Sequence, residues 1–163
     1  MIKASQFLEY YQIELVEKLE DLLDRFYADM LTGGLKPLTA ERHIANAELF
    51  LIEYHAFYFL DDITTLRPEK IYDFLGVWYF QKIIEPTEND ILGILTSLRR
   101  FFSFAAKEGA LPQSVCHELK KVCHDKNYFI RRFHQYEYNP DLCFLTHRPS
   151  QRNRKQSLRR SEE

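Results

Sequence analysis

The chain has 163 residues, of which 45% are hydrophobic and 15% aromatic, and its formal net charge is −2. This composition can bury a core and excludes a disordered chain, and five Gly and six Pro leave long segments that favour helices over a many-turned β fold. Residues 147–163 carry six Arg and Lys against two Glu, which leaves 16 bases against 22 acids elsewhere. This balance excludes a nucleic-acid binder that uses its whole surface and limits any DNA contact to a local patch.

The sequence also bears on location. Three cysteines without the spacing of a disulfide framework are typical of a reducing compartment. The N-terminal apolar stretch contains acids, so it is not a secretory signal, and no apolar run approaches the roughly 20 residues of a membrane span. We therefore expect a cytoplasmic protein with no membrane partner.

The first predicted element is a long amphipathic helix over residues 5–31, with Ser5 as its N-cap and Gly33-Gly34 at its end. Its apolar stripe consists of Leu8, Leu15, Leu19, Leu22 and Phe26, flanked by Val16, Leu23 and Met30. Seven acids occupy much of the remaining surface, so this helix should repel phosphate. It serves either as a brace across the core or as a helix that binds a protein partner or a second copy.

Two aromatic-rich helices follow. One runs from Thr39, its predicted N-cap, to about residue 60, and the other begins at Pro68 and ends before Glu85-Pro86. The side chains expected to be buried are Ile44, Ala47, Leu51, Tyr54 and Tyr58 in the first helix, and Ile71, Phe74, Leu75 and Trp78 in the second. The clusters 57–59 and 78–80 are expected to be core residues first, although their crowding suggests that some aromatics stay exposed.

The clearest boundaries belong to a fourth helix, which starts at a capping box of Thr87 and Asp90 and stops at Gly109. Its apolar stripe is formed by Ile91, Ile94, Leu98, Phe101 and Ala105, widened by Leu95 and Phe102. The opposite face presents Gly93, Thr96, Arg100, Ser103 and Lys107. Because these residues are small, hydroxylated or basic, that face can approach a phosphate backbone closely and donate to it.

A fifth helix, capped by Ser114, is expected to reach about Asp125, and a sixth is expected over about residues 128–136. The pattern is also compatible with a single continuous helix over both segments. Beyond Asn139-Pro140 the regular pattern ends. We expect one helical domain over residues 1–146 and a basic, flexible tail over residues 147–163.

Three motifs point to a known family. They are T-x-x-R-H-x-x-x-x-x-x-F-L from Thr39, I-T-x-L-x-P-E-x-I-x-x-F-L from Ile63, and L-x-x-L-R-R-F-F-S-F-A-x-K-E-G-x-L from Leu95. Their order resembles the N-terminal core-binding domain of tyrosine recombinases and phage integrases, a SAM-like helical bundle that forms one arm of a clamp around DNA. The resemblance covers about residues 39–111. It implies an all-α fold of five to six helices, here preceded by the long acidic helix.

The resemblance also implies that the helices over 39–60 and 87–109 face double-stranded DNA. The candidate DNA-binding residues are Arg42, His43, Arg99, Arg100, Ser103 and Lys107. Nothing among them reads bases in an identifiable way, so such binding would have little sequence specificity. The competing interpretation is that these residues form the solvated face of surface helices. The family's catalytic residues lie on a second domain, and only about fifty residues follow Leu111, so we expect neither recombinase activity nor any other enzyme activity.

Other chemistry-bearing patterns are weaker. Cys116-His117 and Cys123-His124 recur at a seven-residue spacing, with Cys143 and His147 beyond, and could converge on zinc. Buried cysteines with surface histidines explain the pattern better. Asp61-Asp62 is expected to end a helix rather than hold a metal. We predict no catalytic residue, metal, cofactor or small-molecule substrate.

Two functions therefore remain. The first is a non-catalytic DNA-binding accessory module that contacts the phosphate backbone. The alternative is a protein-interaction or dimerisation module that kept the fold and lost DNA binding.

Overall fold

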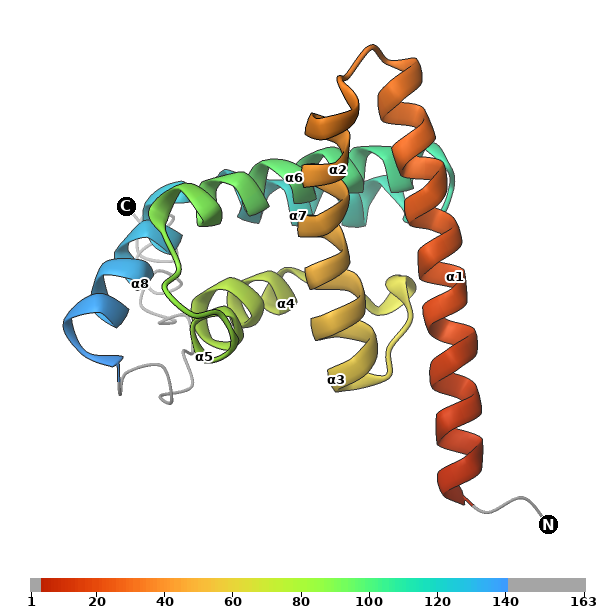
Figure 1. The fold of residues 1–163 in the computed structure, drawn as a ribbon, viewed down its shortest axis with the longest axis horizontal. Helices are drawn as coiled ribbons and strands as arrows, with labels where there is room; N and C mark the ends of the chain where they lie inside the picture. The colour runs from red at the N-terminus through yellow and green to blue at the C-terminus, as the bar shows by residue number, and fades with distance from the viewer. Residues whose placement is uncertain (1–3, 141–163) are drawn as a thin grey trace, which may run out of the picture.

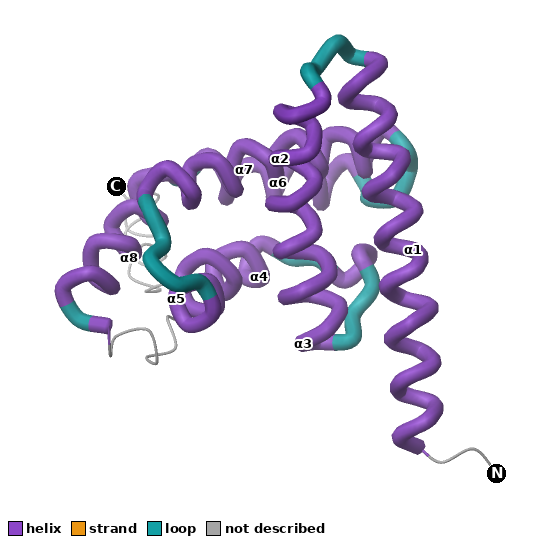
Figure 2. Tube along the Cα trace, viewed as in Figure 1, coloured by secondary structure: helices purple, strands orange, loops and turns teal. Residues whose placement is uncertain are grey.

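The computed structural model describes residues 4–140, with side chains from Glu9 onward, and shows six helical rods and no strand within that range (Figures 1 and 2). The predicted all-α bundle is thereby confirmed. The tail over 147–163, with Cys143 and His147, lies outside the described residues. The first rod is α1 (Ala4–Thr32). The second rod is one continuous run of α2 (Pro37–Glu48), η1 (Leu49–Ala56) and α3 (Phe57–Phe59), and the third rod is a run of α4 (Pro68–Asp73), η3 (Phe74–Trp78) and α5 (Tyr79–Lys82). The remaining rods are α6 (Glu88–Lys107), α7 (Gln113–His124) and α8 (Lys126–Tyr138).

Helix α1 lies beside the α2–α3 rod and runs antiparallel to it (Figure 1). Its predicted stripe is buried from Leu15 to Met30, and the helix ends as expected at the glycine pair. Gly34, with φ +88°, closes a Schellman motif in which the Leu35 amide donates to the Met30 carbonyl at 3.0 Å. Ser5 is not the N-cap, because the helix already includes Ala4.

The second rod starts earlier than predicted, because Pro37 rather than Thr39 sets its first turn. Proline suits that position, since its fixed φ is helical and its missing N–H has no partner there. In the middle of the rod, η1 is a π-helix, whose wider i→i+5 turns rotate the buried face. His55 is therefore buried completely, whereas Tyr58 is 61% exposed. The expectation that Tyr58 lies in the core is wrong for this reason.

The third rod also begins at a proline, Pro68, and also contains a π-helical segment, η3. All four side chains predicted to face inward are buried, and so is the cluster over 78–80. The buried guanidinium of Arg132 in α8 donates two hydrogen bonds to the Gly76 carbonyl, from Nε at 3.1 Å and Nη2 at 2.8 Å. This contact satisfies a carbonyl in the π-helical segment and joins α8 to the third rod.

Helix α6 is the centre of the bundle, because it contacts α1, α2, α7 and α8. Its predicted apolar stripe is entirely buried. The Phe26 ring of α1 packs between Phe101 and Phe104 at centroid distances of 5.4 and 5.2 Å. Such buried aromatic contacts lock α1 onto α6 and thereby position the polar face of α6.

The last two helices are separate. The helical conformation is interrupted at Asp125, whose carboxylate accepts a hydrogen bond from the Tyr128 amide and so caps the start of α8. Ser114 does not cap α7, since that helix begins at Gln113 directly after Pro112.

Candidate nucleic-acid interface

The polar face of α6 is held in place by the two ends of the helix. At its start, Thr87 Oγ1 accepts a hydrogen bond from the Asp90 amide, and the Asp90 carboxylate accepts one from the Thr87 amide, which completes the predicted capping box. At its end, Gly109 adopts φ +78° in a second Schellman motif, in which the Ala110 amide donates to the Ala105 carbonyl. The ends and faces of this helix follow the sequence prediction.

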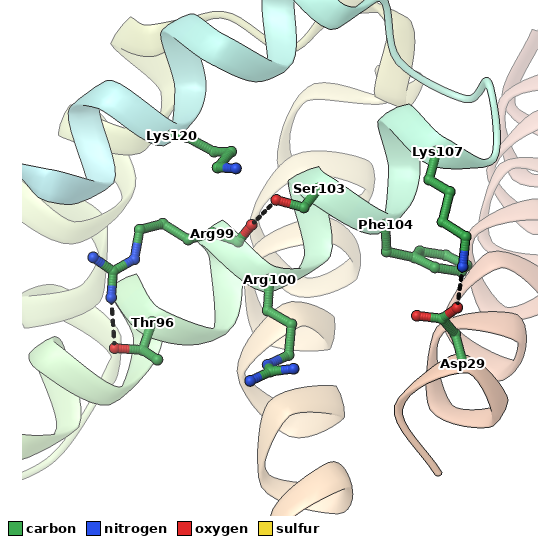
Figure 3. A pocket seen from close by; sticks show the side chains of 8 residues that line it. All are labelled: Asp29, Thr96, Arg99, Arg100, Ser103, Phe104, Lys107 and Lys120. Carbon is green, nitrogen blue, oxygen red and sulfur yellow. Dashed lines mark hydrogen bonds and ion pairs between the residues drawn. The ribbon is translucent and has the colours of Figure 1, made fainter. Parts of the chain in front are cut away.

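An open depression of about 530 Å³ lies on this face, between α6, α7 and the C-terminal end of α1 (Figure 3). It is lined by Asp29, Thr96, Arg99, Arg100, Ser103, Phe104, Lys107 and Lys120. Four of these side chains are cations and one is an acid, so the depression carries net positive charge on a chain that is acidic overall. Concentrated positive charge of this kind favours an anionic ligand.

Arg99 is oriented by two neutral partners. One guanidinium nitrogen donates to Thr96 Oγ1 at 3.2 Å, and the other lies 3.0 Å from His124 Nδ1. Because arginine has no acceptor, His124 must present an unprotonated Nδ1 in this contact. The charge of Arg99 is therefore held in position without being neutralised.

Ser103 contributes less than predicted to the donor set. Its hydroxyl donates to the Arg99 carbonyl at 3.1 Å, so its one hydrogen is already engaged within the helix. In this rotamer the oxygen can accept a hydrogen bond but cannot donate one to a phosphate.

Lys107 is paired. Its ammonium lies 2.6 Å from the Asp29 carboxylate of α1, and this hydrogen bond and charge raise the lysine pKa (Figure 3). A second pair joins the same helices, because Arg25 of α1 contacts Glu108 at 2.9 Å. Helix α1 therefore closes one end of the depression with an acid.

The residues predicted on α2 gather at its contact with α6. His43 Nδ1 lies 2.8 Å from Ser97 Oγ, which also accepts a hydrogen bond from the side-chain Nδ2 of Asn46 at 2.9 Å. Burial lowers the pKa of His43, and the nearby charges of Arg100 and Arg42 lower it further. Arg42, His43 and Arg100 thus lie close enough for their charges to interact. Arg42 and Arg100 are both exposed, so this side of α6 extends the cationic surface.

Sequence reasoning missed two residues of the depression. Lys120 comes from α7 and Asp29 from α1, and neither belongs to the motifs that carried the family resemblance. Lys120 lies one turn before His124 on α7, a spacing that signals a shared face but not which helix that face meets. The sequence does not specify how α1, α6 and α7 pack against one another, and this packing brings Asp29 and Lys120 to the depression.

The other patterns have structural explanations. Cys116 and Cys123 are buried, and burial raises the pKa of Cys123 to about 12, while His117 and His124 lie at the surface. This is the predicted arrangement of core cysteines and surface histidines. Over residues 4–140, no group of three or more His, Cys, Asp or Glu side chains is arranged so that it could hold a metal ion. The Asp62 carboxylate accepts a hydrogen bond from the Thr64 amide and caps the short turn η2 (Ile63–Thr65).

Within the same range, no helix combines the length and hydrophobicity that crossing a membrane requires. Comparison with known proteins provides no family assignment, since no family model, curated protein or solved structure matches this chain.

Proposed function

We propose that this chain is a non-catalytic DNA-binding accessory module, similar in role to a recombinase core-binding domain, that contacts the phosphate backbone of double-stranded DNA with little sequence specificity. The observation that carries the proposal is the cation-lined depression on α6 and α7. Three of its cations, Arg99, Arg100 and Lys120, form no ion pair with an acid in the described part of the chain. They are available to phosphate oxygens.

The lining of the depression supports backbone contact rather than recognition of bases. Its one aromatic residue, Phe104, is 4% exposed, so no ring is presented on which an unpaired base could stack. The exposed aromatics of α3 do not line it. Cations without a stacking platform or an extended amide side chain suit the regular phosphate array of a duplex.

The expected binding is strongly salt-dependent. Each neutralised phosphate of B-DNA contributes about −0.9 to the slope of log affinity against log salt, so three contacts predict a slope of about −2.7. Raising the salt concentration fourfold, from about 50 to about 200 mM, should therefore weaken binding roughly 40-fold. A fluorescence-anisotropy titration of a labelled duplex measures both values.

Two neighbouring lysines provide a matched test. Lys120 lines the depression, whereas Lys121 faces away from it and lines a groove with Pro68 and Tyr72 of α4. Lys120→Glu and Lys121→Glu change the net charge equally. We expect Lys120→Glu to weaken binding about tenfold and to reduce the salt slope by about 0.9, and Lys121→Glu to have a much smaller effect. Equal effects would show that net charge alone attracts the DNA.

Arg100→Glu combined with Lys107→Glu extends the test to α6 and should abolish binding. If the unaltered chain does not bind the duplex even at about 50 mM salt, the proposal is wrong. The interaction-module alternative then becomes the preferred function. If only deletion of residues 148–163 removes binding, the tail and not the depression is the DNA ligand.

A further inference from the structure

A second surface, at the α3 end of the second rod and away from the contact of α2 with α6, combines exposed aromatics with lysines (Figure 1). Phe57, Tyr58 and Phe59 of α3 are 49%, 61% and 38% exposed. The Lys70 ammonium lies 3.3 Å from the centroid of the Phe59 ring, and the Lys82 ammonium lies 5.8 Å from that of Tyr58. We call these five residues the aromatic–lysine surface. Three consecutive exposed aromatic rings are unusual on the surface of a helical bundle and are typical of a protein interface.

The N-terminal part of α1 has the complementary chemistry. The buried stripe of α1 begins at Leu15, and before it Tyr10, Tyr11 and Ile13 are 70%, 41% and 57% exposed. Glu9 and Glu14 lie among them and are exposed as well. We call residues 9–14 the acidic arm. Figure 1 shows this end of α1 extending past α3, where no other described rod covers it.

The two surfaces do not satisfy one another within one chain. The stripe from Leu15 to Met30 fixes α1 along the bundle, and the arm continues the same straight helix. No ring of the arm contacts a ring of α3 in the described residues; the ring contacts of α3 are with Tyr54 and between its own Tyr58 and Phe59. Within the chain, Lys70 contacts Asp61 at 3.8 Å and Glu14 contacts Lys18 at 2.9 Å. Each chain therefore carries an exposed aromatic arm with the acid Glu9 and an exposed aromatic surface with the base Lys82.

We propose that the chain forms a two-fold symmetric dimer in which the acidic arm of each copy packs on the aromatic–lysine surface of the other. The exposed Lys82 then faces Glu9, and the rings of both copies bury one another. Charge complementarity favours the acidic arm of a second copy as the partner of the aromatic–lysine surface, because a dimer in which α1 packs on α1 would bring acids together. A reciprocal exchange of this kind forms the same arm–surface contact twice, uses each surface of each copy once, and closes the assembly at two copies.

Light scattering on the full chain across a concentration series tests the proposal. We expect a species of twice the 19.6 kDa chain mass. Tyr58→Ser and Lys82→Glu should each raise the dimer dissociation constant about tenfold, through lost aromatic burial and through reversed charge respectively. Leu38→Ser is the matched control, because Leu38 is 70% exposed at the start of α2, at the other end of α1, and its loss should leave the dimer unchanged.

A charge exchange tests the pairing itself. Glu9→Lys alone should weaken the dimer as Lys82→Glu does, and the double variant should restore it, because each arm again meets an opposite charge. Both positions are exposed, and unchanged circular dichroism will establish that the variants fold. A chain that stays monomeric at every concentration overturns the proposal, as does a dimer that Tyr58→Ser and Lys82→Glu leave intact. A double variant that stays as weak as the single ones overturns the assigned pairing.

Discussion

Replacing Asp29 with Asn will show how the ion pair between α1 and α6 limits the DNA-binding surface. Asp29 holds the Lys107 ammonium at 2.6 Å, so a phosphate must displace the carboxylate before it can use this lysine. The pair is weak, because Lys107 is 67% exposed and Asp29 38% exposed. Its removal should therefore strengthen DNA binding only about threefold to fivefold at low salt.

The salt dependence gives a sharper measure than the affinity. With Asp29 present, the three unpaired cations predict a slope of about −2.7, and release of Lys107 should steepen it to about −3.6. The assay is the anisotropy titration of a labelled duplex at several salt concentrations. Asp24→Asn is the charge-matched control, since Asp24 is an exposed acid on the same helix and does not line the depression. This variant should keep the slope of the unaltered chain.

A double variant tests whether the steeper slope comes from Lys107. Asp29→Asn with Lys107→Met removes both members of the pair and leaves the net charge unchanged, so its slope should return to about −2.7. If Asp29→Asn binds no more tightly than Asp24→Asn, or if its slope does not steepen, Lys107 is not a phosphate contact. Absence of binding by every variant would instead argue against the DNA-binding proposal as a whole.

Three further predictions concern stability, each measured by urea unfolding. Gly109→Ala should destabilise the fold by about 1 kcal/mol because φ is +78°. Gly93→Ala, inside α6, should be neutral or stabilising, because the added Cβ would lie 3.9 Å from the Asn46 side-chain nitrogen, an ordinary contact distance. Phe26→Ala should cost about 3–5 kcal/mol because its ring is fully buried, while Tyr138→Ala, 91% exposed, should change little; similar values for the two would contradict the assigned core. Burial lowers the pKa of both His55 and His43 below 6.5, so the unfolded chain binds these protons more readily. Stability should therefore fall as the pH drops below 6.5, by at most about 1.4 kcal/mol per pH unit for each histidine. Equal stability at about pH 7.5 and about pH 5.5 would show that neither histidine contributes such a dependence.

The helix ends that follow sequence rules are those whose cause is local. The capping box at Thr87 and the glycine stops after α1 and α6 depend on residues within one turn of the helix end. Thr39 and Ser114 failed as N-caps because a nearby proline, Pro37 or Pro112, placed the first helical turn earlier than they did. Where a proline and a capping residue both signal a helix start, only the backbone conformation shows which of them sets the first turn.

The misplaced face of the second rod has a different cause. A regular helical period puts Tyr58 on the same stripe as Leu51 and Tyr54, and the π-helical turns of η1 rotate it out to solvent. The sequence contains no Pro or Gly there to announce the change. In these wider turns Phe50 and Tyr54 pack together with Phe74 of the third rod, at centroid distances of 5.0 to 5.8 Å, a contact between rods that the local sequence does not specify.

By itself, the sequence determined which face of α6 is buried and which is small, hydroxylated and basic, because both are set by a 3.6-residue period within one helix. Only the tertiary structure decided what surrounds that face. The addition of Lys120 depends on how α7 packs against α6, and the pairing of Lys107 with Asp29 joins residues 78 positions apart. Charges so distant in the chain meet only after the core has fixed the helix axes, so the net charge and extent of the surface follow from packing.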